Sequence, residues 1–444
     1  MTIALPGSAR QNSFPPITGL LMPGVVEKAM VILTFFIFIH STPDTWLRTR
    51  SDFLQDSSNP IGVLLELGLV VLAFMRIAGN IDQLIVMFRL ESLVYSFTGL
   101  VALSVFWSAS PGITIKESIQ LVSITIYASY LVMRFSLEQI VRLLSWVFTI
   151  SAVLNLAVVV ALPQYGIGGE GDWTGIFPQK NALGFFAALA VPTLIIGALG
   201  NRRMRPFFVP ATLIQLALLF GSQSKTMLMA CLVPVALMGV YNMFRSKQTL
   251  RGAVMVSLLG SAVFTVVFVT ANLEVLATSL DKDTSLTGRV PLWQALIPVI
   301  REKPILGHGY GAAFNDYFSP VHEVLIQNRW DPSHAHNAVL QISLEVGLLG
   351  TFLFLALYFR TTSRAIKILA IVPGAIGLWP LVFMTTTLLV SLTESGVTDN
   401  TTGWILFVVA VLTVSLHLKH RTDLGLSNDL RTATMANAKG ITIR

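Results

Sequence analysis

The sequence predicts an all-α, polytopic integral membrane protein with about twelve transmembrane helices and one large loop outside the membrane. Of the 444 residues, 54% are hydrophobic and only 12% are charged, a composition that ordinary water-soluble domains do not have. Apolar runs of roughly 17 to 25 residues recur along the chain, and each can cross a hydrocarbon core of about 30 Å as a helix. A membrane β-barrel is excluded, because its strands would alternate in polarity.

Length and flanking polarity set the expected order of these spans. They cover residues 25–41, 60–76, 90–107, 113–133, 139–162, 182–199, 207–221, 226–243, 252–272, 337–358, 368–391 and 402–417. We therefore expect an N-terminal bundle of about nine helices in residues 1–273, a large loop at 274–336, about three helices at 337–417 and a disordered polar tail at 418–444.

The distribution of basic residues predicts the orientation. Lysine and arginine gather in short loops on one side, at 202–205, 245–251 and 360–367, and in the polar tail. The positive-inside rule places these loops and both termini in the cytoplasm, and the large loop on the outer side. The formal net charge of +7 is spread over these loops rather than gathered on one soluble face, so we expect no nucleic-acid partner.

Histidines mark the large loop as the region of chemistry. Four of the seven lie there, His308, His322, His334 and His336, and histidine is the side chain best suited to accept a proton near neutral pH. A metal site is the alternative, but on a helix His334 and His336 would face different sides and no nearby carboxylate completes a ligand set. We therefore expect no metal.

Five cations are expected on the outer side, against the topological bias: Lys180, Lys225, Arg289, Arg301 and Lys303. Such a group could hold a diphosphate without a metal, because arginine binds phosphate with a planar fork and lysine as a mobile charge. Pairing with anionic lipid headgroups is the simpler alternative for any one of them. Asp281 and Asp283 resemble a metal-binding Asp-x-Asp pair, although a solvated loop explains that short pattern better.

Several other features belong to this outer region. The pattern of residues 289–300 predicts a surface helix, and the glycines at 307, 309 and 311 permit close backbone approach to a ligand. Trp173, in a glycine-rich loop, is equally suited to stacking on a ligand and to anchoring at the interface. Three acidic residues inside apolar stretches, Glu66, Glu345 and Glu394, should face the bundle interior or a polar partner.

Four stretches resemble one known family, the O-antigen polymerases and ligases. They are residues 222–226, TGRVPLW at 287–293, KPILGHGYG at 303–311 and SHAHNAVLQISLEVGLLG at 333–350, and the order of motifs agrees over about residues 175–400. The resemblance implies a metal-independent, inverting glycosyltransferase without cofactors in the bacterial inner membrane, with its active site facing the periplasm. Its donor would be a glycan linked to undecaprenyl diphosphate, and its acceptor a glycan or lipid.

Carried onto this chain, the resemblance assigns two catalytic residues. His336 would be the general base that deprotonates the acceptor hydroxyl, and Arg289 would contact the departing diphosphate. The second cation would be Lys225 or Lys180. The expected substrate site also includes Lys303, His334, Asn337, Glu345 and Trp293.

Residues 173–181 are most similar to exopolysaccharide polymerases of the family, which favours a polymerase over a ligase that attaches glycan to lipid A core or protein. A flippase and a chain-length regulator of the same pathway, together with membrane lipids, would be the natural partners. A polysaccharide or lipid transporter is the alternative of another class, but carriers concentrate polar residues at the membrane midplane, and the two halves of this chain show no internal repeat.

Overall fold

The computed structural model describes residues 23–40, 68, 71, 81–245, 289–315, 319–328, 332, 334–372, 374–395, 397 and 401–438. Within these ranges the protein is helical, and an isolated bridge between Ile167 and Trp173 is the one β-pairing that they contain. The expected span 252–272 lies outside the described residues, as do Glu66, Asp281, Asp283 and, apart from residues 68 and 71, the expected span 60–76.

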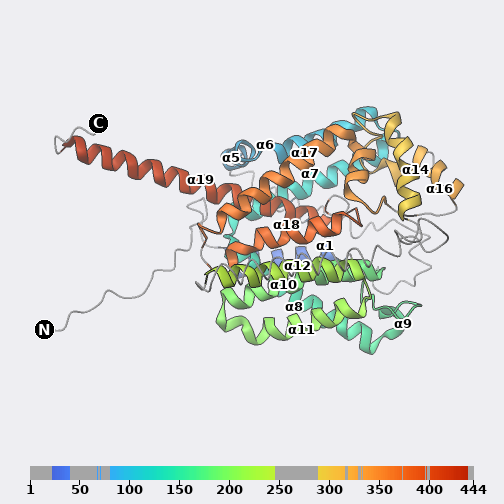
Figure 1. The fold of residues 1–444 in the computed structure, drawn as a ribbon, viewed down its shortest axis with the longest axis horizontal. Coiled ribbons are helices and arrows are strands. Elements are labelled where there is room, and N and C mark those ends of the chain that lie inside the picture. The colour runs from blue at the N-terminus through green and yellow to red at the C-terminus, as the bar shows by residue number, and fades with distance from the viewer. Residues whose placement is uncertain are drawn as a thin grey trace.

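The helices run roughly side by side along one axis (Figure 1). The first half contains α1 (Val25–His40), α5 (Ile81–Leu90), α6 (Ser92–Leu103), α7 (Pro111–Arg134), α8 (Leu137–Ala161), α9 (Pro163–Gly166), α10 (Lys180–Gly200), α11 (Arg205–Gly221) and α12 (Lys225–Arg245). The second half contains α14 (Arg289–Glu302), α15 (Ala312–Asn315), α16 (Pro320–Asn328), α17 (Ala338–Ile368), α18 (Trp379–Ser391) and α19 (Thr401–Ala438), with short 3₁₀ turns η1 (Ser104–Trp107), η2 (Arg202–Met204) and η3 (Ile376–Leu378).

Six helices in the described part are long and apolar enough to cross a membrane, and a seventh span results if the bent pair Ile81–Leu90 and Ser92–Trp107 is taken as one. The prediction of a multi-pass helical protein is thus confirmed, while the count of about twelve spans stays a prediction. The expected span at 90–107 differs in shape, because the chain bends by 99° next to Glu91. The expected last span at 402–417 lies within the candidate span Thr402–Arg421 of α19, a helix that the structure extends to Ala438.

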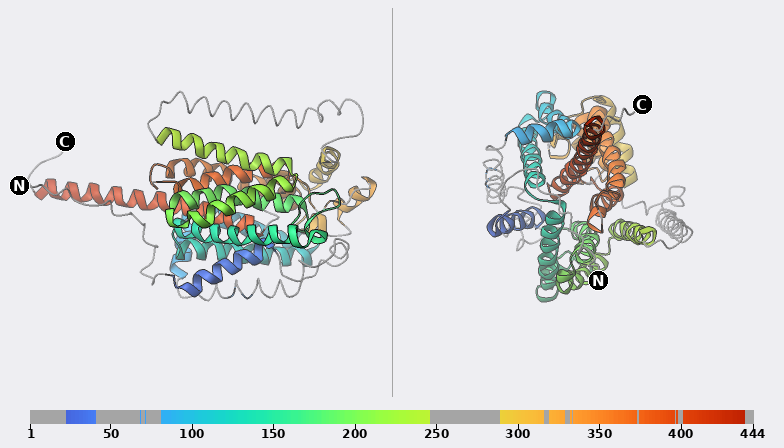
Figure 2. Two further views of the ribbon diagram at one scale, coloured as in Figure 1. Left: turned by 90° about the horizontal axis from the view of Figure 1, so that it is seen from below. Right: turned by 90° about the vertical axis from the view of Figure 1, so that its left-hand side faces the viewer.

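The core lies where the second half of the chain packs on the first. Seen end-on in Figure 2, α19 lies between α7 and α17, and its residues 404–412 are buried. The Trp404 indole donates a hydrogen bond to Thr125 Oγ1 of α7 at 2.8 Å, so the only polar group of this large side chain is satisfied inside the bundle.

At one end of the bundle, ion pairs and a hydrogen bond to a buried carboxylate join three helical segments. Glu91, only 1% exposed, accepts hydrogen bonds from Arg360 at 3.2 Å, from Ser415 at 2.6 Å and from Arg364. These contacts join the bend before α6 to α17 and α19.

The basic loop at 202–205 follows α10, a helix about 30 Å long, so it lies at the opposite end of the bundle from Lys180.

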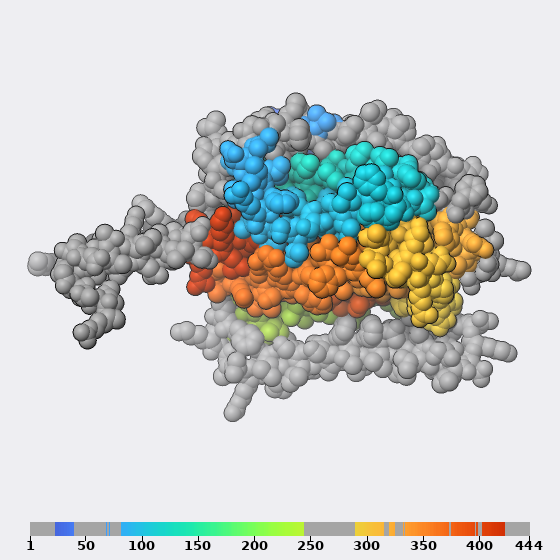
Figure 3. Space-filling model, turned by 90° about the horizontal axis from the view of Figure 1, so that it is seen from above, coloured from blue at the N-terminus to red at the C-terminus, as the bar shows by residue number. Residues whose placement is uncertain are grey.

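The other end carries the segment 289–328, which packs over the start of α17. In Figure 3 the yellow part of this segment forms a compact block against α17 (orange) and α7 (cyan). The helix expected at 289–300 is confirmed as α14, which buries Leu292, Leu296 and Val299 against α17 and α16.

Glycines allow the backbone that follows α14 to insert into a break in helix α17. Helix α17 is broken at Gly347, whose φ of 68° and ψ of −173° are not helical. Residues 304–309 fill the break: Leu344 and Glu345 carbonyls accept from His308 and Gly309 N–H at 2.8 and 2.9 Å, and Leu348 N–H donates to Pro304 at 2.8 Å. All these groups would otherwise lie unpaired in an apolar setting.

This contact explains why glycines stand at 307 and 347. A Cβ on Gly307 would lie 2.6 Å from the Glu345 backbone, and one on Gly347 only 2.2 Å from the Ile305 carbonyl oxygen. The other two glycines of the run approach different segments, because a Cβ on Gly309 would meet Ser108 and one on Gly311 would meet Glu117.

Candidate functional site

The site forms where four separate segments meet at the end of the bundle that carries α14. The turn after α18 supplies Glu394, the start of α14 supplies Arg289, the turn before α17 supplies His334 and His336, and the start of α10 supplies Asn181. Residues up to 213 positions apart in the sequence are in contact here. The side chains of Glu394, Arg289 and the two histidines are mostly buried, with 11 to 20% of their surface exposed.

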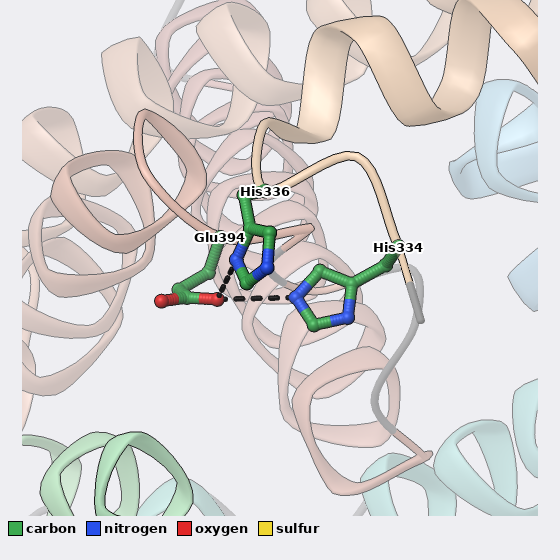
Figure 4. A group of neighbouring side chains, drawn as sticks. All are labelled: His334, His336 and Glu394. Atoms are coloured by element: carbon green, nitrogen blue, oxygen red, sulfur yellow. Dashed lines mark hydrogen bonds and ion pairs between the residues drawn. The ribbon is translucent and has the colours of Figure 1, made fainter. Parts of the chain in front are cut away.

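Glu394 is the centre of this group. Its Oε1 accepts hydrogen bonds from Arg289 Nη2 at 2.7 Å and from Asn181 Nδ2 at 3.1 Å. Its Oε2 faces His334 Nε2 at 3.1 Å and His336 Nδ1 at 2.9 Å (Figure 4). Four donors thus converge on one carboxylate, and we call Glu394, Arg289, His334, His336 and Asn181 the carboxylate cluster.

The surroundings of Glu394 keep it ionised. Burial alone would raise the pKa of the Glu394 carboxyl, but hydrogen bonds from His334 and His336 and the charge of Arg289 lower it to about 2. With both imidazoles neutral, the charges of Glu394 and Arg289 cancel. The cluster can therefore stay buried without uncompensated charge.

The contact to Glu394 selects a tautomer of His336. An ionised carboxylate only accepts hydrogen bonds, so Nδ1 carries the proton in the neutral ring and Nε2 carries the lone pair. This carboxylate–histidine pairing is the arrangement that orients a general base in enzymes.

The histidines do not lie on a helix, as the argument against a metal assumed. They precede α17 in a turn, with His336 at a φ of 49°, and their ring centroids are 4.1 Å apart. The second assumption, that no carboxylate is near, is also wrong, because Glu394 contacts both rings. The sequence predicted that Glu394 faces the bundle interior or a polar partner, and it did not indicate the histidines as that partner.

These findings make His334, His336 and Glu394 a possible ligand set, with ligand atoms within 4.8 Å of one another. Arg289 pairs with the same carboxylate, however, and a guanidinium at 2.7 Å would repel a divalent cation. The geometry is therefore better explained by a hydrogen-bonded ion cluster than by a metal centre.

Lys180 and Lys225 flank the cluster at the first turns of α10 and α12. Asn181 follows Lys180 and joins the two helix ends, because its Oδ1 accepts from Ser224 Oγ at 3.1 Å while its Nδ2 donates to Glu394. Lys180 Nζ pairs with the exposed Glu170 at 3.1 Å, and Lys225 is exposed. Two positive helix ends and two lysines therefore border the cluster.

Other expected site residues have a backbone partner instead. Asn337 caps α17 by accepting from Val339 and Leu340 N–H at 3.0 and 3.1 Å, and donates to the Leu392 carbonyl at 3.3 Å. The Trp293 indole donates to the Ala335 carbonyl at 2.9 Å. Both side chains hold the turn that carries the two histidines.

Lys303, Glu345 and His308 lie away from the cluster. Lys303 follows the last residue of α14 and is exposed, about 20 Å along the helix from Arg289. Glu345 is buried in α17, where its Oε1 accepts from Gly311 N–H at 3.1 Å and Gln341 Nε2 at 3.0 Å. His308 is buried, with Nε2 3.0 Å from the Val299 carbonyl oxygen.

The loop that contains Trp173 packs on the turn between α11 and α12. Trp173 N–H donates to the Gly221 carbonyl at 2.8 Å, and its ring occupies the space that a Cβ on Gly221 would need. Buried Asn155 of α8 holds the same loop by accepting from Ile176 N–H at 3.0 Å. The loop thus fixes the start of α12, next to Lys225.

The fold and the site define a polytopic helical membrane protein with a buried polar cluster at one end of its bundle. Comparison with known proteins shows which proteins the chain is similar to. Residues 210–355 match the family model described as O-antigen ligase. The chain is 26% identical over 312 residues to the exopolysaccharide production protein ExoQ of Rhizobium meliloti, a match that covers 65% of this chain and 67% of that protein.

Shorter matches also involve proteins described as acting on polysaccharides. A protein of Rickettsia conorii, named as a candidate polysaccharide ligase, is 37% identical over 86 residues, and one of Rickettsia typhi with the same description is 37% identical over 81 residues. Each match covers only 20% of the rickettsial protein, and 18 and 17% of this chain. The resemblance to the O-antigen polymerase and ligase family that the motifs indicated is confirmed.

Proposed function

We propose that this protein is a membrane glycosyltransferase that polymerises repeat units of an exopolysaccharide or O-antigen, using a glycan linked to undecaprenyl diphosphate as donor. The carboxylate cluster is the observation on which the proposal rests. It combines a histidine oriented by a carboxylate with an arginine, at a bundle end bordered by two further lysines. We assign this end to the periplasm, because the loop at 202–205 at the other end is basic.

In the proposed reaction the acceptor hydroxyl attacks the anomeric carbon of the donor from the side opposite the diphosphate. The new glycosidic bond forms as the bond from the anomeric carbon to the diphosphate oxygen breaks, which inverts the anomeric centre. The hydroxyl proton passes to Nε2 of His336, and Glu394 stabilises the resulting imidazolium. The released product is undecaprenyl diphosphate.

Cations stabilise the leaving diphosphate in this scheme. The contact with Glu394 uses one of the five N–H donors of Arg289, and the others suit phosphate oxygens. Lys180 and Lys225, at the starts of α10 and α12, would add mobile positive charge where the leaving group develops negative charge.

The experiment is direct. The purified protein is supplied in detergent and EDTA with an undecaprenyl-diphosphate oligosaccharide of its source bacterium, and lipid-linked products are separated by gel and identified by mass spectrometry. A ladder of repeat units supports a metal-independent polymerase. A ladder that appears only when EDTA is replaced by a divalent metal would overturn the interpretation of the three ligand side chains as an ion cluster.

A ligase is the second candidate, because residues 210–355 match an O-antigen ligase model and the rickettsial relatives are described as ligases. It would share the donor chemistry and differ in acceptor. Transfer only after addition of lipid A core or a protein acceptor would favour the ligase, and flux across vesicles without new glycosidic bonds would favour a transporter.

A further inference from the structure

The turn that holds the two histidines has a conformation that needs outside support. His336 has a φ of 49°, in the left-handed region that residues with a side chain rarely adopt. The residue before it, Ala335, is completely buried, so both of its backbone polar groups require partners inside the protein.

Two side chains from different helices supply those partners. Gln341 of α17 accepts from Ala335 N–H through Oε1 at 2.8 Å, and Trp293 of α14 donates to the Ala335 carbonyl at 2.9 Å. The peptide groups on both sides of Ala335 are therefore fixed in direction, and with them the start of His336.

The direction of the Gln341 amide is itself determined. Its Nε2 donates to Glu345 Oε1 at 3.0 Å, and the same oxygen accepts from Gly311 N–H at 3.1 Å. The Ala335 N–H can only donate, so the amide oxygen of Gln341 must face Ala335 and the amide nitrogen must face Glu345. Gln341 and Glu345 are 3% and 2% exposed, so water does not compete for these bonds.

We propose that Gln341 is a positioning residue for the reaction: it fixes the turn at Ala335 and thereby the place at which His336 presents Nε2 to the acceptor hydroxyl. The proposal rests on the proposed function, in which His336 is the base. Glu345 orients Gln341 and ties it to the segment inserted into α17. Gln341 touches neither donor nor acceptor, so its loss alters turnover more than donor binding.

The test compares Gln341→Met with Gln215→Met. Methionine has a similar shape but makes neither hydrogen bond. Gln215 is an apt control because it is also buried in a helix, at 3% exposure, and its amide also bonds to the backbone, by donating to the Phe148 carbonyl at 3.0 Å. It lies on α11, which packs against α8 and α10, and its partner Phe148 belongs to α8.

With the undecaprenyl-diphosphate oligosaccharide as donor, kcat of Gln341→Met should fall about tenfold to a hundredfold while KM for the donor stays near that of the unmodified protein, because a small displacement of a base is enough for such a loss. Gln215→Met should change neither constant. Equal losses of kcat in both variants, or none in Gln341→Met, would overturn the proposal.

A second measurement needs no turnover. Diethyl pyrocarbonate modifies accessible neutral imidazoles, and mass spectrometry gives the modification rate of His336 in each folded variant, with thermal unfolding as the check on folding. The rate should change in Gln341→Met and stay constant in Gln215→Met; an unchanged rate in Gln341→Met refutes the positioning. Absence of product from the unmodified protein would instead refute the proposed function, and this readout would still decide the role of Gln341.

Discussion

Replacing Glu394 with glutamine tests the carboxylate cluster most directly. Lowering the pKa of Glu394 from 4.5 to about 2 corresponds to a preference of about 3 kcal/mol for the ionised carboxylate in the folded protein. Glutamine has no charge, and its amide offers one acceptor oxygen. Whichever way it turns, its NH₂ group meets donors, either those of Arg289 and Asn181 or those of the imidazoles.

The expected result follows from these magnitudes. Without the carboxylate, the imidazolium on His336 loses a charge-assisted hydrogen bond in the transition state, which contributes about 1.5–3 kcal/mol and corresponds to about tenfold to a hundredfold in rate. Stability should also decrease, because Arg289 is left partly buried beside donors. Product formation on gels and thermal unfolding in detergent measure the two effects.

The matched control is Glu138→Gln. Glu138 pairs with Arg142 at 3.3 Å one turn along α8, its side chain is 52% exposed, and such a surface pair contributes less than about 1 kcal/mol. If Glu394→Gln keeps its activity within about twofold of the unmodified protein, less than about 0.5 kcal/mol, the idea that this carboxylate supports the base is refuted.

The other predictions follow from the same contacts. His336→Ala should insert and fold normally yet lose at least about a hundredfold in kcat, since a positioned base contributes about that much; normal ladders from this variant would remove it from the mechanism. Arg289→Lys keeps the positive charge but loses the planar guanidinium, so KM for the donor should rise and kcat should fall. Unchanged constants would show that two-pronged binding of phosphate by the guanidinium is not used. Gly347→Ala should lower unfolding stability by about 1–3 kcal/mol, whereas Gly239→Ala on α12, where a Cβ meets nothing within 4 Å, should lose none. Because the folded pKa of Glu394 is lowered, its contribution to stability is complete above about pH 4.5 and is lost as the pH falls towards about 2, which acid titration of thermal unfolding in Glu394→Gln and the unmodified protein can check.

Helix positions could be predicted because the membrane imposes a minimum length of apolar sequence. The expected span 139–162 became α8 at Leu137–Ala161, and 182–199 became α10 at Lys180–Gly200. The local composition is sufficient to predict the positions of such helices. It does not predict the bend beside Glu91, because that bend brings a buried carboxylate to Arg360 and Arg364, which lie far away in the sequence.

The candidate site could be predicted only in part, for a related reason. Residue type pointed to His336 and Arg289, but the group that joins them, Glu394, lies 58 and 105 positions away. Gln341 carried no signal, since a single amide in an apolar run resembles an ordinary packed residue. The left-handed φ of His336 also cannot be read from a pattern, because surrounding tertiary contacts impose it.

The insertion of residues 304–309 into α17 bears on how this protein can be recombined with its relatives. Chimaeras that exchange residues 289–336 while keeping the host's own α17 would separate two halves of a single hydrogen-bonded unit. We expect functional exchanges only when the 304–309 and 344–349 segments come from the same parent, so specificity carried by residues 289–336 will be inherited together with part of a membrane helix.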